Sequence, residues 1–505
     1  MVQGTASHVG KSLLVAGLCR LFRDGGWRVA PFKAQNMALN AYVTRDGREI
    51  GWAQAVQAEA AGLPPSVEMN PILLKPHADA GSQVIIHGNV WGNLTAREYY
   101  AQRPVLWEAI RTSYDGLARE YDLILIEGAG SPAEPNLMAH DITNMAVARL
   151  ARAPVLLVGD IDRGGVFAAL LGTLTLLPPK DRRRIRALII NKFRGDRSLL
   201  SPGIEFLERK ARRPVLGIVP HLHGLAIPEE DSVSIEEIEN VNTYAIPLES
   251  RHEPRPFRVV VVRLPHIANF ADFSPLEQEP GISLGYTANP DGLGQADLLI
   301  LPGSKNTIGD LRFLKESGWA KRILSYHRDG GLVGGICGGL QMLGLRVEDP
   351  EGLETGGEED GLALLPLVTR LEAPKVTRQV RATLLLGPWG AAQEFEAYEI
   401  HMGRSWPIGE CSPLFEILAP ESSEPVGYCS SDGRAWGSYL HGLFDSPGLR
   451  RAFFSWLGAN RPVGHEPLPP SLDYRALREA SYNRLAETLR AHLSLDLLWN
   501  IVGER

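Results

Sequence analysis

Cysteine is scarce in this sequence, and long apolar runs are absent from it. Only 4 of the 505 residues are cysteines, and none of them has the C-x-x-C spacing of a zinc site, so we expect neither a disulfide framework nor structural zinc. No segment approaches the roughly 18 uninterrupted apolar residues that span a membrane. The first residues also lack the apolar core of a signal peptide. We therefore expect a cytoplasmic protein with no membrane partner.

An excess of positive charge is lacking as well. The formal net charge is −7, so nothing favours nucleic acid or an anionic membrane as a partner. Hydrophobic residues make up 44% and charged residues 22% of the chain, which is ordinary for a folded globular protein. At roughly 100–200 residues per domain, the length predicts two to four domains. The oligomeric state stays open, a homo-oligomer included.

Short apolar runs alternate with longer amphipathic stretches in the first part of the chain. Runs of this kind, apolar on both faces, are typical of parallel strands buried between helices. They predict a doubly wound α/β domain over residues 1–225. The runs are Leu123–Ile126, Val155–Val158, Leu188–Ile190 and Val215–Val219.

A change of composition separates this domain from a second one. Residues 226–256 are acidic and rich in proline and glutamate, which predicts a linker with a short element inside it. A second α/β module is predicted over residues 257–448 and a helical extension over 449–505, where apolar residues recur three or four apart between Tyr474 and Leu498. Strands of the second module are predicted at Val259–Val262, Leu298–Leu301, Leu332–Ile336, Glu396–Ile400 and Ala435–Tyr439.

A phosphate-binding loop is predicted at the start of the chain. Residues 4–12 have the sequence GTASHVGKS and precede an apolar helix. Gly4, Thr5 and Gly10 would let backbone N–H groups surround phosphate oxygens. Lys11 would supply a charge, and the Ser12 hydroxyl would bind Mg²⁺. Five residues separate the two glycines, so the loop is a variant of the usual pattern. The alternative is a chance Gly-Lys-Ser turn before a helix.

Three polar segments that follow predicted strands support a nucleotide site. Glu127 stands just past one strand, where a carboxylate can hold Mg²⁺; the alternative is an acid that caps the next turn, and the phosphate loop favours the metal role. Residues 159–165, GDIDRGG, follow a second strand. Asn191 follows a third, where it could contact the nucleotide base. Turn chemistry alone is the alternative for the last two segments.

Residues 332–343, LVGGICGGLQML, predict a nucleophilic cysteine. An apolar strand ends at Cys337, small residues flank it, and a helix follows, as in a nucleophile elbow. Such a bend is expected to expose the sulfur, and the helix N-terminus favours its thiolate. The N–H groups of Gly338 and Gly303 are candidate donors to an oxyanion. A buried structural cysteine is the alternative for Cys337, and a plain turn is the alternative for Gly303.

A general base has to come from another part of the sequence. His441, in GSYLHG, stands at the tip of a predicted strand, and the following Gly442 leaves room around its ring. His401, in YEIHMGRS, also ends a strand and is the rival base. We expect His441 to serve Cys337.

Taken together, these segments resemble the glutamine-hydrolysing cobyric acid synthase family over nearly the whole chain. The matching segments include QGTASHVGKS, APFKAQNMALN, LIEGAGSPAE, GDIDRGGVFA, LPGSKNT, GGICGGLQMLG, YEIHMGRS and YLHGLFD, in this order. The resemblance implies a dethiobiotin-synthetase-like P-loop domain with a parallel sheet, joined to a class I glutamine amidotransferase domain. It also implies Cys337 as nucleophile and His441 as base.

The resemblance further implies an activity. It is the amidation of the b, d, e and g carboxylates of the corrinoid adenosylcobyrinic acid a,c-diamide to adenosylcobyric acid, with ATP, Mg²⁺ and with L-glutamine as nitrogen donor. Three alternatives stay open: a cobyrinic acid a,c-diamide synthase, a partitioning-type P-loop ATPase without amidation activity, and a relative that has lost glutaminase catalysis. Ala6 stands where partitioning ATPases carry a second lysine, which argues against the second.

Two features of the sites stay unassigned. Class I amidotransferases usually carry a glutamate two residues after the histidine, but this chain has Leu443 there. Asp445 and Glu399 are the candidates to orient His441 instead. For the corrinoid, the candidates are polar residues in apolar contexts, namely Lys33, Gln35, Asn36 and Lys75.

Overall fold

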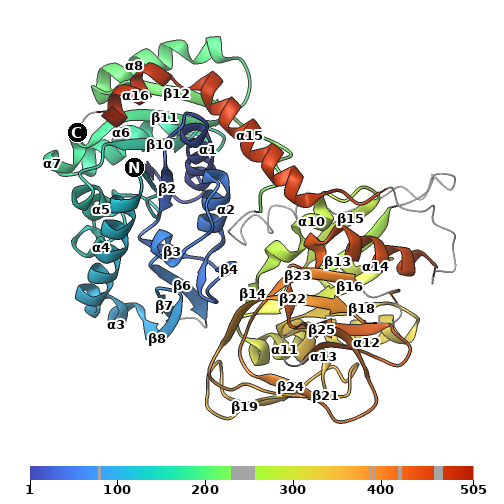
Figure 1. Ribbon diagram of the computed structural model, residues 1–505. Helices are drawn as coiled ribbons and strands as arrows, with labels where there is room; N and C mark the ends of the chain where they lie inside the picture. The colour runs from blue at the N-terminus through green and yellow to red at the C-terminus, as the bar shows by residue number, and fades with distance from the viewer. Residues whose placement is uncertain are drawn as a thin grey trace.

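The protein consists of two α/β modules that lie side by side (Figure 1). The structure, a computed structural model, describes residues 1–77, 81–228, 256–385, 389–390, 393–418, 424–459 and 470–503. Most of the predicted linker, residues 229–255, lies outside the described residues. The predicted fold class, a parallel-sheet P-loop module and a second α/β module with C-terminal helices, is confirmed.

A parallel sheet forms the centre of the first module. Four strands pair in the order β1-β10-β11-β12, and β2 pairs with β9. A parallel bridge between Val2 and Glu127 joins the two groups. The strands are β1 Val2–Gly4, β2 Val29–Phe32, β9 Leu123–Ile126, β10 Val155–Asp160, β11 Ile185–Phe193 and β12 Val215–Pro220. The four predicted strands of this part are therefore all present.

Helices cover both faces of this sheet, because successive strand residues point to opposite faces. Val2, Val158 and Ile189 belong to the core that also contains side chains of α1 and α15. Their neighbours Leu157 and Ile190 belong to the core under α4, α5 and α6. The helices are α1 Lys11–Asp24, α2 Trp52–Ala61, α4 Arg103–Glu120, α5 Met145–Leu150, α6 Val166–Leu176 and α15 Tyr474–His492.

An insertion between β2 and β9 adds strands that could not be predicted from the sequence; β3 and β6 pair parallel, and the other pairs are antiparallel. It holds a sheet in the order β3-β6-β7-β8 and a hairpin of β4 and β5. The strands are β3 Gln35–Met37, β4 Ala41–Val43, β5 Glu49–Gly51, β6 Ile72–His77, β7 Gly81–Ile86 and β8 Asn89–Thr95. The hairpin contacts β22 and β23 of the second module.

The second module is built on a ten-stranded sheet in the order β15-β13-β16-β18-β27-β26-β25-β22-β23-β28. The first five strands are parallel, and the rest pair antiparallel. Their bounds are β15 Ile282–Thr287, β13 Phe257–Val262, β16 Leu298–Leu301, β18 Val333–Ile336, β27 Ala435–Ser438, β26 Glu424–Cys429, β25 Ser412–Ile417, β22 Val376–Leu384, β23 Gln393–His401 and β28 Leu440–His441.

The antiparallel half of this sheet curls back on itself. Only Tyr439 separates β27 from β28 along the chain, yet β28 lies at the far end of the sheet beside β23. The strands from β26 to β23 therefore wrap around and return to the strand from which they start. This curl places β23 next to the residues that follow β27.

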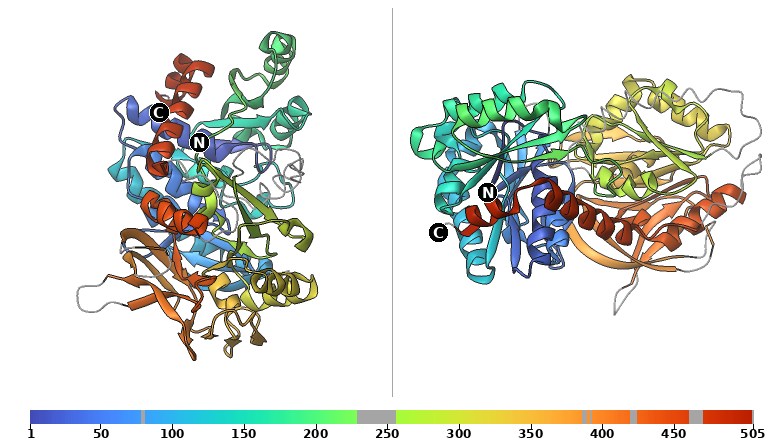
Figure 2. Two further views of the ribbon diagram at one scale, coloured as in Figure 1. Left: turned by 90° about the vertical axis from the view of Figure 1, so that its right-hand side faces the viewer. Right: turned by 90° about the horizontal axis from the view of Figure 1, so that it is seen from above.

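The C-terminal helices belong to two different modules. Helix α14, Pro447–Ala459, contributes Phe453, Phe454 and Leu457 to the core of the second module. Helices α15 and α16, Leu495–Gly503, pack on the first module and lie across it in Figure 2. The periodic stretch from Tyr474 is thus two helices and not one, because Leu493 bridges Gly217 and the Ser494 N–H donates to the Leu216 carbonyl at 2.8 Å.

Helix α15 packs directly on α1, the helix that follows the phosphate loop. A Cβ placed on Gly17 of α1 would lie 2.6 Å from Leu489 Cδ1 and 2.8 Å from Leu485 Cγ. Only glycine allows the two helices to approach this closely. Beside this contact, Arg20 Nη2 lies 2.7 Å from Glu479 Oε2. The last helices of the chain therefore complete the core of the first module.

We expect Leu489→Ala to lower the free energy of unfolding of the first module by about 2–5 kcal/mol. Truncation of a buried leucine at this contact would leave a cavity. Leu489 is fully buried, whereas Leu199 is 81% exposed. Urea denaturation followed by tryptophan fluorescence measures both variants. Leu199→Ala, the matched control, should change the free energy of unfolding of the first module by less than about 0.5 kcal/mol. Equal shifts for the two variants would show that α15 adds little to this core.

Candidate active sites

Cys337 stands on a strained bend between β18 and α13, Gly338–Leu343. Its backbone has φ 53° and ψ −109°, a conformation that costs energy for a residue with a side chain. A Cβ on Gly335 would lie 2.6 Å from the Gly339 carbonyl oxygen, and one on Gly339 would lie 2.0 Å from the Leu301 carbonyl oxygen. The flanking glycines are therefore required by the close packing of the bend, as the sequence predicted.

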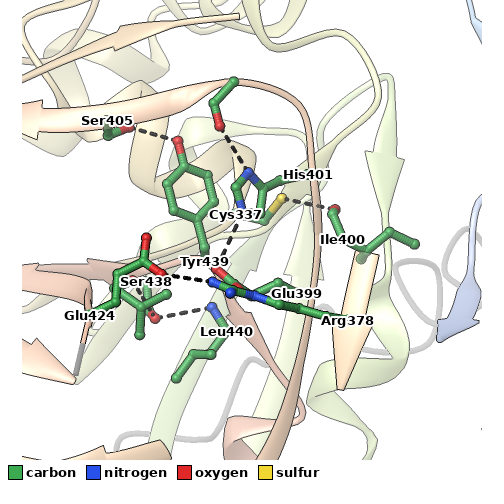
Figure 3. Close-up of polar contacts among 12 residues, drawn as sticks. Cys337, Arg378, Glu399, Ile400, His401, Ser405, Glu424, Ser438, Tyr439 and Leu440 are labelled. Carbon is green, nitrogen blue, oxygen red and sulfur yellow. Dashed lines mark hydrogen bonds and ion pairs between the residues drawn. The ribbon is translucent and has the colours of Figure 1, made fainter. Parts of the chain in front are cut away.

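The sulfur of Cys337 is covered, so the expectation of an exposed thiol is wrong. Cys337 is 8% exposed. Its Sγ donates to the carbonyl oxygen of Ile400 on β23 at 3.7 Å (Figure 3). The cause is the curl of the antiparallel strands, which brings β23 over the bend. Protein atoms therefore screen most of this side chain from solvent.

His441 lies next to Cys337 because their strands are neighbours. Ile336 of β18 pairs with Ser438 of β27, and the Cys337 N–H donates to the Ser438 carbonyl at 2.7 Å. His441, three residues further along, is fully buried. Its Nε2 has no hydrogen-bond partner among the described residues. That nitrogen is the one available to exchange a proton with the sulfur.

Asp272 orients the ring of His441, and neither Asp445 nor Glu399 does so. Asp272 lies in η4, Phe270–Phe273, and its Oδ2 is 2.6 Å from His441 Nδ1. Its other oxygen accepts from the Gly442 N–H at 3.0 Å. Because a carboxylate only accepts, Nδ1 carries the proton and Nε2 is the nitrogen turned away from Asp272.

This contact changes the proton affinity of the imidazole. Burial alone would lower the pKa of His441, but Asp272 and the Cys337 sulfur outweigh burial and raise that pKa to about 10. The sequence analysis missed Asp272 because it lies 169 residues before His441 and outside any predicted strand end. An acidic residue inside the apolar stretch NFADFSP was the one local indication.

His401, the rival base, has both ring nitrogens engaged. Its Nδ1 lies 3.1 Å from the Gly403 carbonyl, and its Nε2 lies 3.3 Å from Glu399 Oε1. Glu399 in turn accepts from Arg378 Nε at 2.5 Å, as Figure 3 shows. The ring also stacks on Tyr439 at 3.9 Å between centroids. These contacts hold His401 as a structural residue beside the site, which favours His441 as the base.

The two predicted oxyanion residues meet beside the histidine. Gly303 begins β17, Gly303–Ser304, and a Cβ placed on it would lie 3.7 Å from His441 Cε1. A Cβ on Gly338 would lie 2.8 Å from the backbone nitrogen of Ser304. The backbones of both segments therefore approach each other closely, next to Cys337 and His441.

The predicted phosphate loop runs from β1 to α1. Lys11 Nζ donates to the carbonyls of Ala6 at 2.9 Å and Gly130 at 3.3 Å. Thr5 N–H donates to Val158 O at 2.9 Å, and Gly10 has φ 93°. These contacts place the lysine across the loop, where an incoming phosphate would replace its carbonyl partners.

Asn191 supports the loop from the neighbouring strand. Its Nδ2 donates to the Val9 carbonyl at 2.8 Å, and a Cβ placed on Gly10 would lie 2.2 Å from that nitrogen. The segment 159–165 is paired with the segment that follows Asn191, since Asp160 contacts Lys192 at 3.0 Å. The predicted strand-end residues are thus close together at one edge of the sheet.

Ser12 and Glu127, the two predicted Mg²⁺ ligands, contact each other. Ser12 Oγ donates to Glu127 Oε1 at 2.9 Å. Burial would raise the pKa of Glu127, but Lys33, whose Nζ lies 2.9 Å from it, Gln57 and Lys11 hold the pKa below its ordinary value. An ionised carboxylate and a hydroxyl are oxygen ligands of the kind Mg²⁺ takes, so the residues fit this ion. Among the described residues, no group of three or more His, Cys, Asp or Glu side chains is arranged to hold a metal ion.

The four residues predicted as candidates for binding the corrinoid lie in two different places. Lys33 contacts Glu127 at the nucleotide site. Gln35 Oε1 accepts from Tyr99 at 2.6 Å, and Asn36 donates to Gln54 at 3.0 Å. They follow β2, at the sheet edge that holds the nucleotide site.

Lys75 lies apart from the other three, between the modules. It contacts Glu49, whose other oxygen lies 2.5 Å from Lys375 Nζ of the second module. Burial lowers the pKa of Lys75 to about 7. Burial would raise the pKa of Glu49, but the two lysines lower it to about 2. Lys75 is therefore tied into the contact between the modules.

Two family profiles cover most of the chain. The CobQ/CobB/MinD/ParA nucleotide binding domain matches residues 1–235, and the CobB/CobQ-like glutamine amidotransferase domain matches residues 258–449. The cobyric acid synthase of Syntrophobacter fumaroxidans is 46% identical over 100% of this chain and 98% of its own length. That of Sorangium cellulosum is 49% identical with the same coverage. The chain belongs to the cobyric acid synthase family.

Membership of this family makes the protein a ligase of cobalamin biosynthesis, with a glutamine amidotransferase domain and a nucleotide-binding domain. A matched glutamine amidotransferase domain excludes the partitioning-type ATPase alternative. Among solved structures, PurLQS from Thermotoga maritima matches 41% of this chain with 18% identity and a TM-score of 0.32. None of the helices formed by the described residues is both long and apolar enough to cross a membrane.

We expect Asp272→Asn to lower kcat for glutamine hydrolysis by about 10²–10⁴-fold, since an amide neither fixes Nδ1–H nor stabilises the imidazolium. Ammonia release from glutamine is the measurement. Glu399→Gln is the matched control, because Glu399 contacts His401 and not His441. An equal loss in both variants would contradict the role of Asp272.

The raised pKa of His441 also predicts a pH-dependent stability. The pKa is about 10 in the folded protein and about 6.5 in an unfolded chain. Folding therefore gains stability from the protonated ring, fully below about pH 6.5, and loses it as the pH rises through about 10. The destabilisation caused by Asp272→Asn should be largest near pH 6 and smallest near pH 10. Urea titrations of both proteins test this, and a difference that does not vary with pH would contradict it.

Proposed function

We propose that this enzyme uses ATP and glutamine to amidate the b, d, e and g carboxylates of adenosylcobyrinic acid a,c-diamide, giving adenosylcobyric acid. The observation that carries the proposal is the Cys337, His441 and Asp272 arrangement in one module, with a phosphate loop beside Ser12 and Glu127 in the other. Full-length identity to cobyric acid synthases supports the substrate. The proposal divides the chain at 1–225, 226–256, 257–448 and 449–505.

Glutamine hydrolysis would begin at the sulfur. His441 holds the proton of Cys337, and the sulfur attacks the side-chain amide carbon of glutamine, while the N–H groups of Gly303 and Gly338 donate hydrogen bonds to the oxyanion. With a pKa of about 10, His441 holds that proton until it is given to the departing nitrogen, which leaves as ammonia. Water then cleaves the thioester to glutamate, and the thiol is restored. Asp272 keeps Nδ1 protonated throughout.

The carboxylate would be activated in the other module. Its oxygen attacks the γ-phosphorus of ATP, ADP leaves, and ammonia then displaces phosphate from the carboxyl phosphate to form the amide. Lys11 and the loop from Gly4 to Ser12, with Asn191 behind it, would hold the phosphates. Ser12 and Glu127 would hold Mg²⁺, which supplies positive charge to the phosphate oxygens. Lys33, Gln35 and Asn36, which follow β2, and Lys75, which lies between the modules, are the candidate residues for the corrinoid.

A mass assay separates the two corrinoid substrates. The enzyme should add four amides to the a,c-diamide and none to the a and c positions of cobyrinic acid. Amidation of cobyrinic acid only at a and c would instead identify a cobyrinic acid a,c-diamide synthase. The same assay with L-glutamine as donor follows glutamine hydrolysis and amidation together, and with ammonium as donor it follows amidation alone.

We expect Cys337→Ala to abolish glutamine-dependent amidation and to keep ammonium-dependent amidation within about twofold, because only the first uses the thiol. Lys11→Ala is the complementary variant, since loss of the phosphate-binding charge should stop amidation with either donor. Product mass and ADP release are measured with each donor. Loss of both glutamine-dependent and ammonium-dependent amidation in Cys337→Ala, or amidation with either donor in Lys11→Ala, would contradict the proposal that the two half-reactions use separate sites.

A further inference from the structure

Rings from both modules meet above the catalytic histidine. Tyr398 of β23 stacks on His441 with centroids 5.1 Å apart and an interplanar angle of 17°. Trp52 and Tyr42 of the first module lie 6.5 Å and 6.4 Å from Tyr398. Trp52 and Tyr398 are each 7% exposed. A residue of the first module is thus one ring away from the imidazole.

Tyr398 limits the positions that the imidazole can take. It is the direct cross-strand partner of His441, in a pairing only two residues long. Asp272 holds one edge of the imidazole, and the Tyr398 ring covers one face. The Tyr398 hydroxyl has no hydrogen-bond partner among the described residues. The contact with His441 is therefore made by the ring and not by the hydroxyl.

The first module contacts both supports of the histidine through one short segment. The Ala41 N–H donates at 3.0 Å to Asn269, which caps the helix that carries Asp272. On the other side, Gln379 of β22 donates to the Val43 carbonyl at 2.8 Å, next to β23. The β4–β5 hairpin leads directly into α2, whose first residue is Trp52.

Helix α2 also reaches the nucleotide site. Gln57 Nε2 lies 2.5 Å from Glu127 Oε2 and 3.3 Å from the Ser12 carbonyl. Trp52 and Gln57 are five residues apart on one helix, which is about 7.5 Å along its axis. One rigid element therefore contacts the residues proposed to hold Mg²⁺ and the ring that covers His441.

We propose that Tyr398 is a positioning residue for His441, and that Trp52 holds Tyr398 in place from the other module. Docking of α2 then completes the glutaminase site. The inference rests on the proposed roles of Cys337 and His441. It assigns to the first module a part in a reaction that uses no ATP.

The test compares Trp52→Ala, Trp52→Phe and the control Trp27→Ala in the full-length enzyme. Trp27 belongs to the same module but is 37% exposed and contacts Phe22. Trp52→Ala should lower kcat for glutamine hydrolysis by about 10–100-fold, with KM for glutamine and ammonium-dependent amidation within about twofold of the unchanged enzyme. Trp52→Phe should recover most of the loss. Equal losses with glutamine and ammonium, or no loss, would overturn the inference.

Tyr398→Leu and Tyr398→Phe test the second ring in the same assay. Tyr398→Leu should lower kcat for glutamine hydrolysis and leave KM for glutamine unchanged. Tyr398→Phe should keep kcat close to that of the unchanged enzyme, because the ring makes the contact with His441. Cys337→Ala distinguishes failure of this inference from failure of the proposed function. If Cys337→Ala still hydrolyses glutamine, the proposed function fails. If it is inactive while Trp52→Ala behaves as Trp27→Ala, only this inference fails.

Discussion

The contact between Asp272 and His441 is the interaction on which the site around Cys337 depends. Both side chains are almost entirely buried, and a charged group out of water is costly unless a partner compensates it. Each therefore needs the other, and the 2.6 Å contact at Nδ1 sets the direction in which Nε2 points. The curl of the antiparallel strands makes this burial possible, because it places β23 against β28. Cover over the thiol and burial of the imidazole thus have one structural origin.

The two modules are interlocked more than their order in the sequence suggests. Helices α15 and α16 follow the amidotransferase module in the chain, yet they fill the core of the nucleotide module against α1. Helix α1 begins with Lys11 and Ser12, so the final residues of the chain support the phosphate loop. In the other direction, α2 and the β4–β5 hairpin of the first module lie against β22, β23 and Asn269. Residues that follow the amidotransferase module in the chain therefore support the phosphate loop, and elements of the first module lie against the site of the second.

The strands of both parallel sheets could be predicted, because a buried parallel strand needs apolar residues on both faces. Leu123–Ile126 and Leu298–Leu301 match their predicted bounds. The insertion sheet was missed, since strands such as β3, Gln35–Met37, are three residues long and partly polar. The break after α15 was missed too. Leu493 keeps the helical spacing of apolar residues but leaves the helix to pair with Gly217.

The local chemistry of both sites could be predicted from short segments of the chain. Glycines around Cys337 and before Lys11 are needed within a few residues of the bend or loop they form, so they can be recognised without a fold. The three-dimensional fold was needed to show that Asp272 contacts His441, that the thiol is covered, and that Lys75 and Lys375 both contact Glu49. These partners are far apart in the chain, 169 residues for the first pair. Their contact depends on how the sheet curls and how the modules dock, and no local pattern of residues encodes that.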